Sequence, residues 1–67
     1  MECELWLKRR NEERFDYIKN ISYNSCFYEL NCVDDEQFSE AIIIQRINGL
    51  LKCIAYKKYE NKVLRKK

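Results

Sequence analysis

Apolar and polar residues alternate at the start of the chain. Cys3, Leu5 and Leu7 alternate with Glu4, Trp6 and Lys8. A period of two places these three side chains on one face of an extended segment. The pattern therefore predicts a β-strand over residues 3–9, with Trp6 on the opposite face from the leucines.

Two further segments show the same alternation and are predicted as strands, over residues 14–21 and 26–32. The intervening segment 22–25 has the polar composition of a turn. The third strand has the cleaner pattern, because one face is apolar and the other polar. Its inward positions are Cys26, Tyr28, Leu30 and Cys32.

A helix start follows at Asp34, which has Gln37 three residues later, as in a capping box. Two readings of the next segment are open. In the favoured one a short helix begins at Asp35 and ends near 41, and a strand covers 42–47. In the other the helix continues through 47. The isoleucines of 42–47 favour the strand, because β-branched side chains lose rotamer freedom in helices and would not form one apolar stripe there.

Asn48-Gly49 is the strongest local signal in the chain, since Gly49 is the only glycine and there is no proline. Two apolar runs flank this pair, which predicts a β-hairpin with a two-residue type I′ turn. The hairpin pairs Ile47 with Leu50 and, continuing regularly, Ile43 with Ile54. Both faces of this hairpin are then largely apolar.

These elements predict the α+β class: one small domain over residues 1–67, with an antiparallel sheet of about five strands and one short helix starting near Asp35. Val63 is assigned to a short final strand, and the last few residues are expected to be mobile. One short helix covers only one face of the sheet. The other face is closed by the first strands as a small barrel, by a second copy in a homodimer, or by another protein.

Composition restricts the function. The chain has 67 residues and no histidine, so the usual nucleophile–histidine pairs are absent and no reaction is indicated. We expect no enzymatic activity and no cofactor. No apolar run approaches the length of a membrane span, and the first residues lack the layout of a signal peptide, which predicts a cytoplasmic protein without membrane contact.

The four cysteines stand at positions 3, 26, 32 and 53. Their spacing lacks the close pairs of zinc sites. Free and mostly buried thiols are favoured, with two disulfides or a metal site as the alternatives.

Charge is unevenly distributed along the chain. Between Asn20 and Gln45 there are five acids and no base, whereas residues 46–67 hold eight bases and one acid. If the fold keeps these segments apart, the molecule has an acidic end and a basic end that steer charged partners.

Candidate partner-binding residues come from three groups. Acids over a strand end and a helix start can imitate a phosphate backbone, lysines beside tyrosines are typical of nucleic-acid contact, and exposed aromatics anchor protein interfaces. The candidates are Trp6, Glu29, Asp34, Asp35, Glu36, Tyr56, Lys57, Lys58 and Tyr59.

The run Ile47-Asn48-Gly49-Leu50, then Ala55-Tyr56-Lys57, then Glu60 and Lys62, resembles the closing hairpin of small phage-encoded anti-CRISPR proteins. This resemblance covers about 16 residues and implies a non-catalytic inhibitor that docks on a CRISPR effector complex, a host ribonucleoprotein, and blocks target DNA. The alternatives are a small DNA- or RNA-binding regulator that uses the basic C-terminal region, and a homodimeric adaptor.

Overall fold

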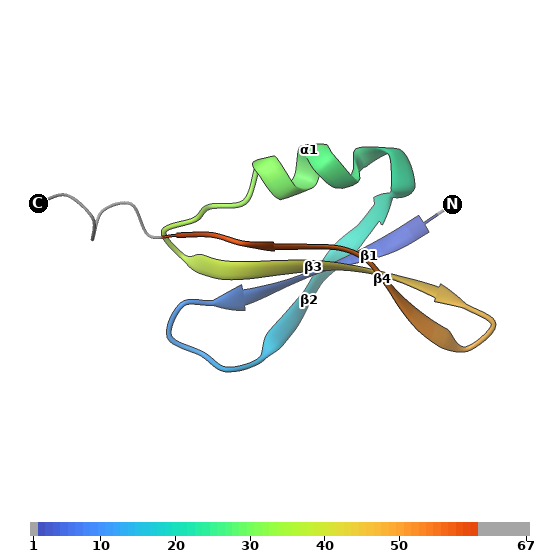
Figure 1. The fold of residues 1–67 in the computed structure, drawn as a ribbon, viewed down its shortest axis with the longest axis horizontal. Coiled ribbons are helices and arrows are strands. Elements are labelled where there is room, and N and C mark those ends of the chain that lie inside the picture. The colour runs from blue at the N-terminus through green and yellow to red at the C-terminus, as the bar shows by residue number, and fades with distance from the viewer. Residues whose placement is uncertain (1, 61–67) are drawn as a thin grey trace, which may run out of the picture.

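The computed structural model describes residues 2–60, which form a four-stranded antiparallel sheet with one α-helix on one face (Figure 1). The strands are β1 (Glu2–Arg9), β2 (Phe15–Ser22), β3 (Phe38–Ile47) and β4 (Leu50–Lys58), and the helix is α1 (Cys26–Asn31). The strand order is β2-β1-β3-β4, so β1 and β3 are the central strands. The predicted α+β class with an antiparallel sheet is confirmed.

The helix lies at Cys26–Asn31, where a third strand was predicted, so that prediction is wrong. Cys26 and Leu30 are buried, whereas Tyr28 and Cys32 are exposed. A spacing of four places Cys26 and Leu30 on one helix face, and the same residues also satisfy a period of two. A short 3₁₀ turn (Tyr23–Ser25) leads into the helix, and the Ser22 side chain accepts a hydrogen bond from the backbone N–H of Asn24.

The helix predicted from Asp35 to 41 is also wrong. A single turn forms there, in which the Asp34 carbonyl accepts the N–H groups of Gln37 and Phe38. The Asp34 carboxylate accepts the N–H of Glu36, as the capping signal implies. The chain then enters β3 at Phe38, because the β-branched run pairs with β1 on one side and β4 on the other. The strand reading of 42–47 is confirmed.

The predicted hairpin turn at Asn48-Gly49 is present, with φ of 53° at Asn48 and 81° at Gly49, as a type I′ turn requires. Its register agrees with the prediction from Ile47↔Leu50 as far as Ile44↔Cys53. Beyond that pair the prediction is wrong, because Ile54 is an extra residue and Ile43 faces Ala55. This bulge places Tyr56 opposite Ile42 rather than on the face of Ile43.

A second bulge lies on the opposite outer strand. Leu5 faces Lys19 while Trp6 faces Tyr17, which leaves Ile18 as the extra residue of β2. These two bulges fall on the outer strands of the sheet, whereas a third shift of register lies near the start of the central strand β3, where Lys8 faces Glu40 and Arg9 faces Phe38.

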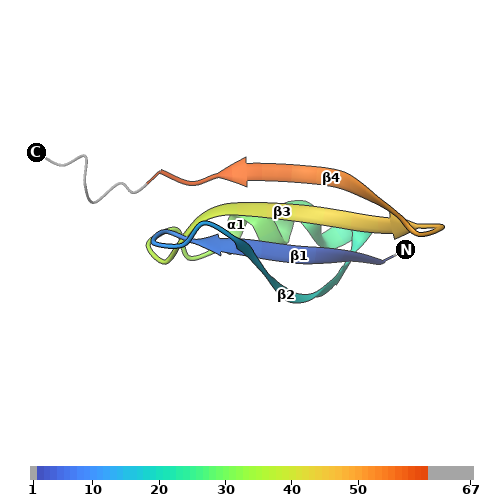
Figure 2. The same cartoon turned by 90° about the horizontal axis from the view of Figure 1, so that it is seen from below.

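The core lies between α1 and one sheet face. Leu5 and Ile43 project from the central strands toward Cys26 and Leu30 of the helix. Ile43 is fully buried, at 0% exposure. Within residues 2–60 no element covers the other face, and Figure 2 views that face with α1 behind the strands. The barrel alternative is thus not what the described residues form, and the final strand and the mobile C-terminus predicted for 61–67 lie outside them.

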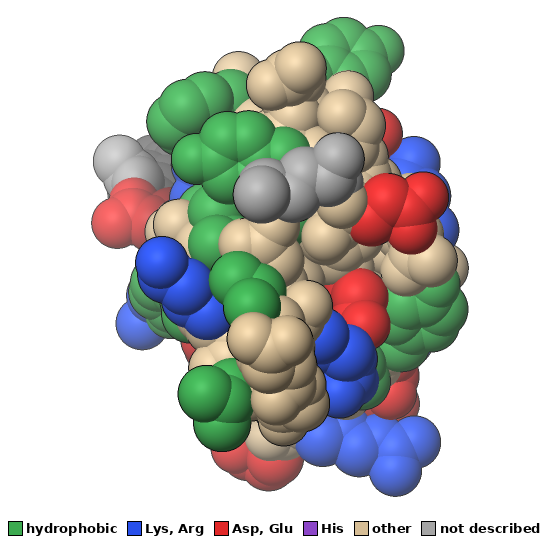
Figure 3. All heavy atoms as spheres, turned by 90° about the vertical axis from the view of Figure 1, so that its right-hand side faces the viewer, with side chains coloured by type: hydrophobic (Ala, Val, Ile, Leu, Met, Phe, Trp, Pro, Cys, Tyr) green, Lys and Arg blue, Asp and Glu red, His purple; other side chains and the backbone are tan. Residues whose placement is uncertain are grey.

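Within residues 2–60 the fold does not separate acidic from basic side chains as predicted, and four of the eight bases of the predicted basic segment lie outside the described residues. Lys8 pairs with Glu40 at 3.8 Å, and Arg46 pairs with Glu4. Lys58 of β4 also stands directly opposite Glu40. At the end of the molecule shown in Figure 3, red and blue side chains are interspersed rather than gathered by sign. Antiparallel pairing of β3 with β4 places Lys58 of the basic segment beside Glu40 of the acidic segment, and β1 adds a further ion-pair partner to Glu40 and to Arg46.

Candidate functional site

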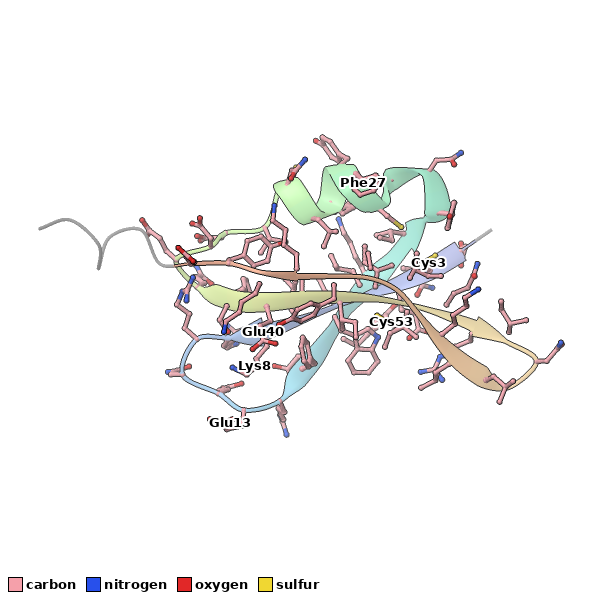
Figure 4. The ribbon with its side chains drawn as sticks, in the orientation of Figure 1. Cys3, Lys8, Glu13, Phe27, Glu40 and Cys53 are labelled. Carbon is pink, nitrogen blue, oxygen red and sulfur yellow. The ribbon has the colours of Figure 1, made fainter. Side chains whose placement is uncertain are left out.

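The sheet face away from α1, which we call the open face, carries the even-numbered residues of β1 and β3. Residues directly opposite each other on neighbouring strands share a face, so the register identifies the other members. Lys8 and Glu40 are labelled on this side of the sheet in Figure 4, with Phe27 on the helix at the other side. The open face consists of Glu2, Glu4, Trp6, Lys8, Phe15, Tyr17, Asn20, Ser22, Glu40, Ile42, Ile44, Arg46, Leu51, Cys53, Tyr56 and Lys58.

A continuous row of large side chains crosses the middle of the open face. Tyr17, Trp6, Ile42 and Tyr56 stand opposite one another on the four strands. The Trp6 and Tyr17 rings meet edge to face, with centroids 5.7 Å apart and planes at 70°. Tyr17 and Tyr56 are about half exposed, at 49% and 54%. The row is therefore a broad apolar strip that residues 2–60 leave in contact with solvent.

The polar atoms of this row are held by neighbouring side chains. Trp6 Nε1 donates to Glu4 Oε1 at 3.0 Å, and the other oxygen of that carboxylate pairs with Arg46. The Tyr56 hydroxyl donates to Glu40 Oε1 at 2.9 Å, and Lys8 binds the second oxygen of Glu40. Two ion pairs thus hold the Trp6 and Tyr56 side chains, which fixes the ring orientations before any partner arrives.

These hydrogen bonds shift the titration of the groups involved. The bond from Arg46, and then the bond from Trp6, lowers the pKa of Glu4. The Arg46 pKa is raised by the same bond. The hydrogen bond to Glu40 raises the pKa of Tyr56, because it stabilises the protonated phenol beside a carboxylate.

We expect the Glu4 contribution to stability to disappear in acid. Because its folded-state pKa lies below the ordinary 4.5, the contribution is present above that pH and is lost as the pH falls through the folded-state value. The difference in unfolding free energy between the wild type and Glu4→Gln should therefore shrink from about pH 6 to about pH 3. Arg46→Gln, which removes the partner, should show the same convergence in urea titrations; a constant offset for both variants would contradict this assignment.

The charges of the open face balance. Lys8, Arg46 and Lys58 carry positive charge there. The acids on the same face are Glu2, Glu4 and Glu40. A surface that binds a nucleic-acid backbone carries an excess of cations, so this face has the charge pattern of a protein interface instead.

Of the residues predicted to bind a partner, the structure brings Trp6, Tyr56 and Lys58 together on the open face. Lys57 lies on the helix side, where its Nζ donates to Asn31 at 3.4 Å and lies 5.2 Å from the Tyr59 ring centroid. The predicted cluster of Tyr56, Lys57, Lys58 and Tyr59 is thus divided between two faces of the sheet.

Tyr59 is placed in the core, at 8% exposure. Its hydroxyl donates to the Leu30 carbonyl at 2.6 Å, and its N–H donates to the Ser39 carbonyl at 2.8 Å. Arg10 also donates to the Tyr59 carbonyl, at 2.8 Å. Burial raises the pKa of the Tyr59 phenol. These contacts fasten the end of β4 to the helix, a structural role rather than a partner contact.

The predicted acidic residues do not form one surface with the open face. Glu29 lies on α1 and pairs with Lys19 at 3.1 Å. Asp34, Asp35 and Glu36 form the turn before β3, and Arg10 holds the Asp35 carbonyl through two N–H groups. Neither the turn that holds Asp34 and Glu36 nor the helix that holds Glu29 belongs to the sheet face that carries Trp6.

Sequence reasoning missed Tyr17, Ile42 and the charged residues that support the row. The alternation along β1 correctly predicted that Trp6 lies on the opposite face from the leucines. The supporting residues depend on the pairing of β1 with β3, which joins segments more than 30 residues apart. No local pattern reports that pairing.

The cysteines are free thiols, of which Cys3 and Cys26 are buried and Cys32 and Cys53 exposed. The pKa of Cys26 is raised chiefly by burial, and to a lesser extent by the charge of Cys3 and the hydrogen bond with it. The higher pKa keeps this thiol protonated and unreactive. The prediction of mostly buried thiols therefore holds for half of them. Within residues 2–60, no cluster of three or more acidic or cysteine side chains is arranged to hold a metal ion.

A second apolar surface lies on the helix side. Phe27 is 81% exposed, and together with Tyr23 and Ile54 it lines a shallow pocket of about 300 Å³ between the start of α1 and β4. The aromatic row on the open face differs from this pocket in the orientation of its rings. Hydrogen bonds to carboxylates orient Trp6 and Tyr56 in the row.

No helix within residues 2–60 has the length and apolar character needed to cross a lipid bilayer. Comparisons of the chain with protein-family models, with curated protein sequences and with solved structures find no match.

Proposed function

We propose that this chain is a small non-catalytic inhibitor that docks through its open face on a host nucleic-acid-processing complex in the cytoplasm. The observation that carries the proposal is the row of Tyr17, Trp6, Ile42 and Tyr56, in which both tyrosines are about half exposed and the Trp6 and Tyr56 rings are oriented by hydrogen bonds to carboxylates. Tryptophan and tyrosine dominate the energetics of protein interfaces. Rings that are already fixed lose little conformational entropy on binding.

The choice of a protein partner over a nucleic acid rests on charge. The open face presents its aromatic rings between two ion pairs, Glu4–Arg46 and Lys8–Glu40, and has no excess of cations among the described residues. A complex that processes nucleic acid is proposed as the host because the closing hairpin resembles that of anti-CRISPR proteins. Blocking target DNA by occupying a protein surface needs no chemistry from the inhibitor.

Nucleic-acid binding is the second candidate, favoured by one observation. Lys52, Lys57 and Lys58 are exposed along β4, an outer strand of the sheet. Cations along an edge strand are also a common protection against edge-to-edge aggregation, and only Lys58 of the three shares a face with the aromatic row.

Affinity capture separates the two candidates. The full chain is immobilised, incubated with nuclease-treated host lysate, and compared with Tyr17→Ala/Tyr56→Ala and with Lys52→Gln/Lys57→Gln, whose lysines both lie on the helix side of β4. We expect the wild type and the lysine variant to retain the same protein, the tyrosine variant to lose it, and the wild type to inhibit the nucleic-acid-processing activity of that protein.

Three outcomes would overturn the proposal: loss of all retained material on nuclease treatment, capture that depends on the lysines rather than the tyrosines, or a retained protein whose activity the chain leaves unchanged. Circular dichroism of both double variants checks that each is folded.

A further inference from the structure

We infer that a second copy of this chain covers the open face when no other partner is bound, in a symmetric dimer that stacks the two sheets face to face. This inference rests on the proposed function in one respect, namely that the open face is a docking surface. The inference adds that a second copy of the chain occupies this surface, and that the host partner must displace that copy.

The topology supplies the symmetry. The central strands are β1 and β3, flanked by β2 and β4. A two-fold axis that runs parallel to the strands, midway between the two stacked sheets and over the line between β1 and β3, places β1 of one copy over β3 of the other and β2 over β4. Because this axis lies over the middle of each sheet, the two open faces overlap over their full width. Such an interface is self-complementary only if residues on β1 suit residues on β3.

The charges meet that condition. Lys8 and Glu40 occupy the same row on the two central strands. The two-fold operation places Lys8 of one copy over Glu40 of the second, and Glu40 over Lys8. At the other end of the face, Arg46 of one copy comes over Glu2 of the second, whereas Glu4, which stands opposite Ile44 in the register, comes over that isoleucine. Four of the five charges that the central strands carry on this face thus meet the opposite sign, and Glu4 keeps its ion pair with Arg46 of its own chain.

The apolar row is self-complementary as well, because its residues on β1 suit those on β3. Trp6 and Ile42 are opposite each other in the register, so the operation places the large ring of one copy over the smaller side chain of the other. On the outer strands the operation places Tyr17 of one copy over Tyr56 of the other, two rings of equal size. The large-on-small contacts of the central strands interdigitate at the spacing of about 10 Å that stacked sheets adopt.

The size of the face sets the strength of the dimer. Four strands about 4.8 Å apart, over six or seven residues each, present a face of about 15 by 20 Å. This is about 300 Å² per copy, well below the roughly 800 Å² per partner of a standard interface, so we expect a weak dimer that forms at high micromolar concentrations of the chain. A dimer of that strength leaves room for a tighter host partner to replace the second copy.

Charge reversal provides the test, measured as the dissociation constant by sedimentation velocity of the full chain from about 1 to 500 μM. Lys8→Glu sets two carboxylates against each other at both contacts of the pair, and Glu40→Lys sets two ammonium groups together in the same way. Each variant alone should dimerise at least about tenfold more weakly than the wild type. In an equimolar mixture the heterodimer regains attractive contacts between the copies, and its affinity should return to within about threefold of the wild type.

The mixture also separates interface from fold. Each variant loses the Lys8–Glu40 ion pair within its own chain whether alone or mixed, so a purely structural effect would not be rescued. Lys52→Glu is the matched control, because Lys52 stands opposite Gln45 on the helix side; this variant should dimerise like the wild type. A wild type that stays monomeric over the whole range, a mixture no stronger than its components, or an equal effect of Lys52→Glu would overturn the inference.

Failure here is distinguishable from failure of the proposed function. A monomeric wild type that still captures a host protein through Tyr17 and Tyr56 overturns the dimer alone. A dimer that shows the charge-swap behaviour but captures no host protein overturns the inhibitor alone.

Discussion

Ile43→Ala is expected to lower the free energy of unfolding by about 2–5 kcal/mol, the usual range for truncation of a fully buried aliphatic side chain. Ile43 has no exposed surface and lies on a central strand, between the leucines of β1 and the helix. Neighbours on both sides are held in the sheet and cannot move into the cavity. A domain of 67 residues has little reserve stability, so this loss approaches the total.

Urea unfolding followed by circular dichroism measures this effect, with Ile44→Ala as the matched control. Ile44 is the next residue of the same strand and lies on the open face, where it is only half-buried. We expect its truncation to cost about 1 kcal/mol. If the two variants lose the same stability, the assignment of one covered and one open face is wrong.

Trp6→Ala is expected to weaken binding of the host protein by about 30- to 1,000-fold, which corresponds to about 2–4 kcal/mol for the loss of a central aromatic anchor. Trp6 lies on a central strand, in contact with Tyr17 and bonded to Glu4. The truncation removes the largest ring of the face and releases the Glu4 side chain from one of its two hydrogen bonds. Affinity is measured by titration calorimetry with the protein identified by capture.

Phe27→Ala is the control for Trp6→Ala, because it removes another exposed aromatic ring, on the helix side of the molecule. Its effect on affinity should stay within about threefold of the wild type. Equal losses from both variants would show that the partner does not select the open face. Melting curves of the two variants establish that binding, rather than folding, has changed.

The elements predicted correctly are those whose signals are local. The alternation around Leu5 and Leu7 identified β1, and Asn48-Gly49 identified the closing hairpin and its turn. In both cases neighbouring residues along the chain determine the conformation. The helix at Cys26–Asn31 was not predicted, because its two buried residues, four positions apart, fit a strand and a helix equally well.

The remaining differences arise from contacts between distant segments. The capping signal at Asp34 produced a real turn, but pairing of β3 with β1 extended the strand back to Phe38 and left no room for a helix. The bulge at Ile54 moved Tyr56 to the face of Trp6. For the candidate site, Trp6 and Tyr56 were predicted as anchors, whereas the roles of Glu4, Lys8 and Arg46 became visible only once the central strands were paired.

The bulges on the two outer strands bear on how copies of this chain meet at high concentration. Ile18 and Ile54 interrupt the regular ladder on the outer strands, the positions where a further strand would add to the sheet. A twisted, interrupted edge is a poor template for the straight hydrogen-bonded stacking of amyloid fibrils. Lateral growth is therefore disfavoured on both flanks, and crowding should produce closed pairs of molecules instead of filaments.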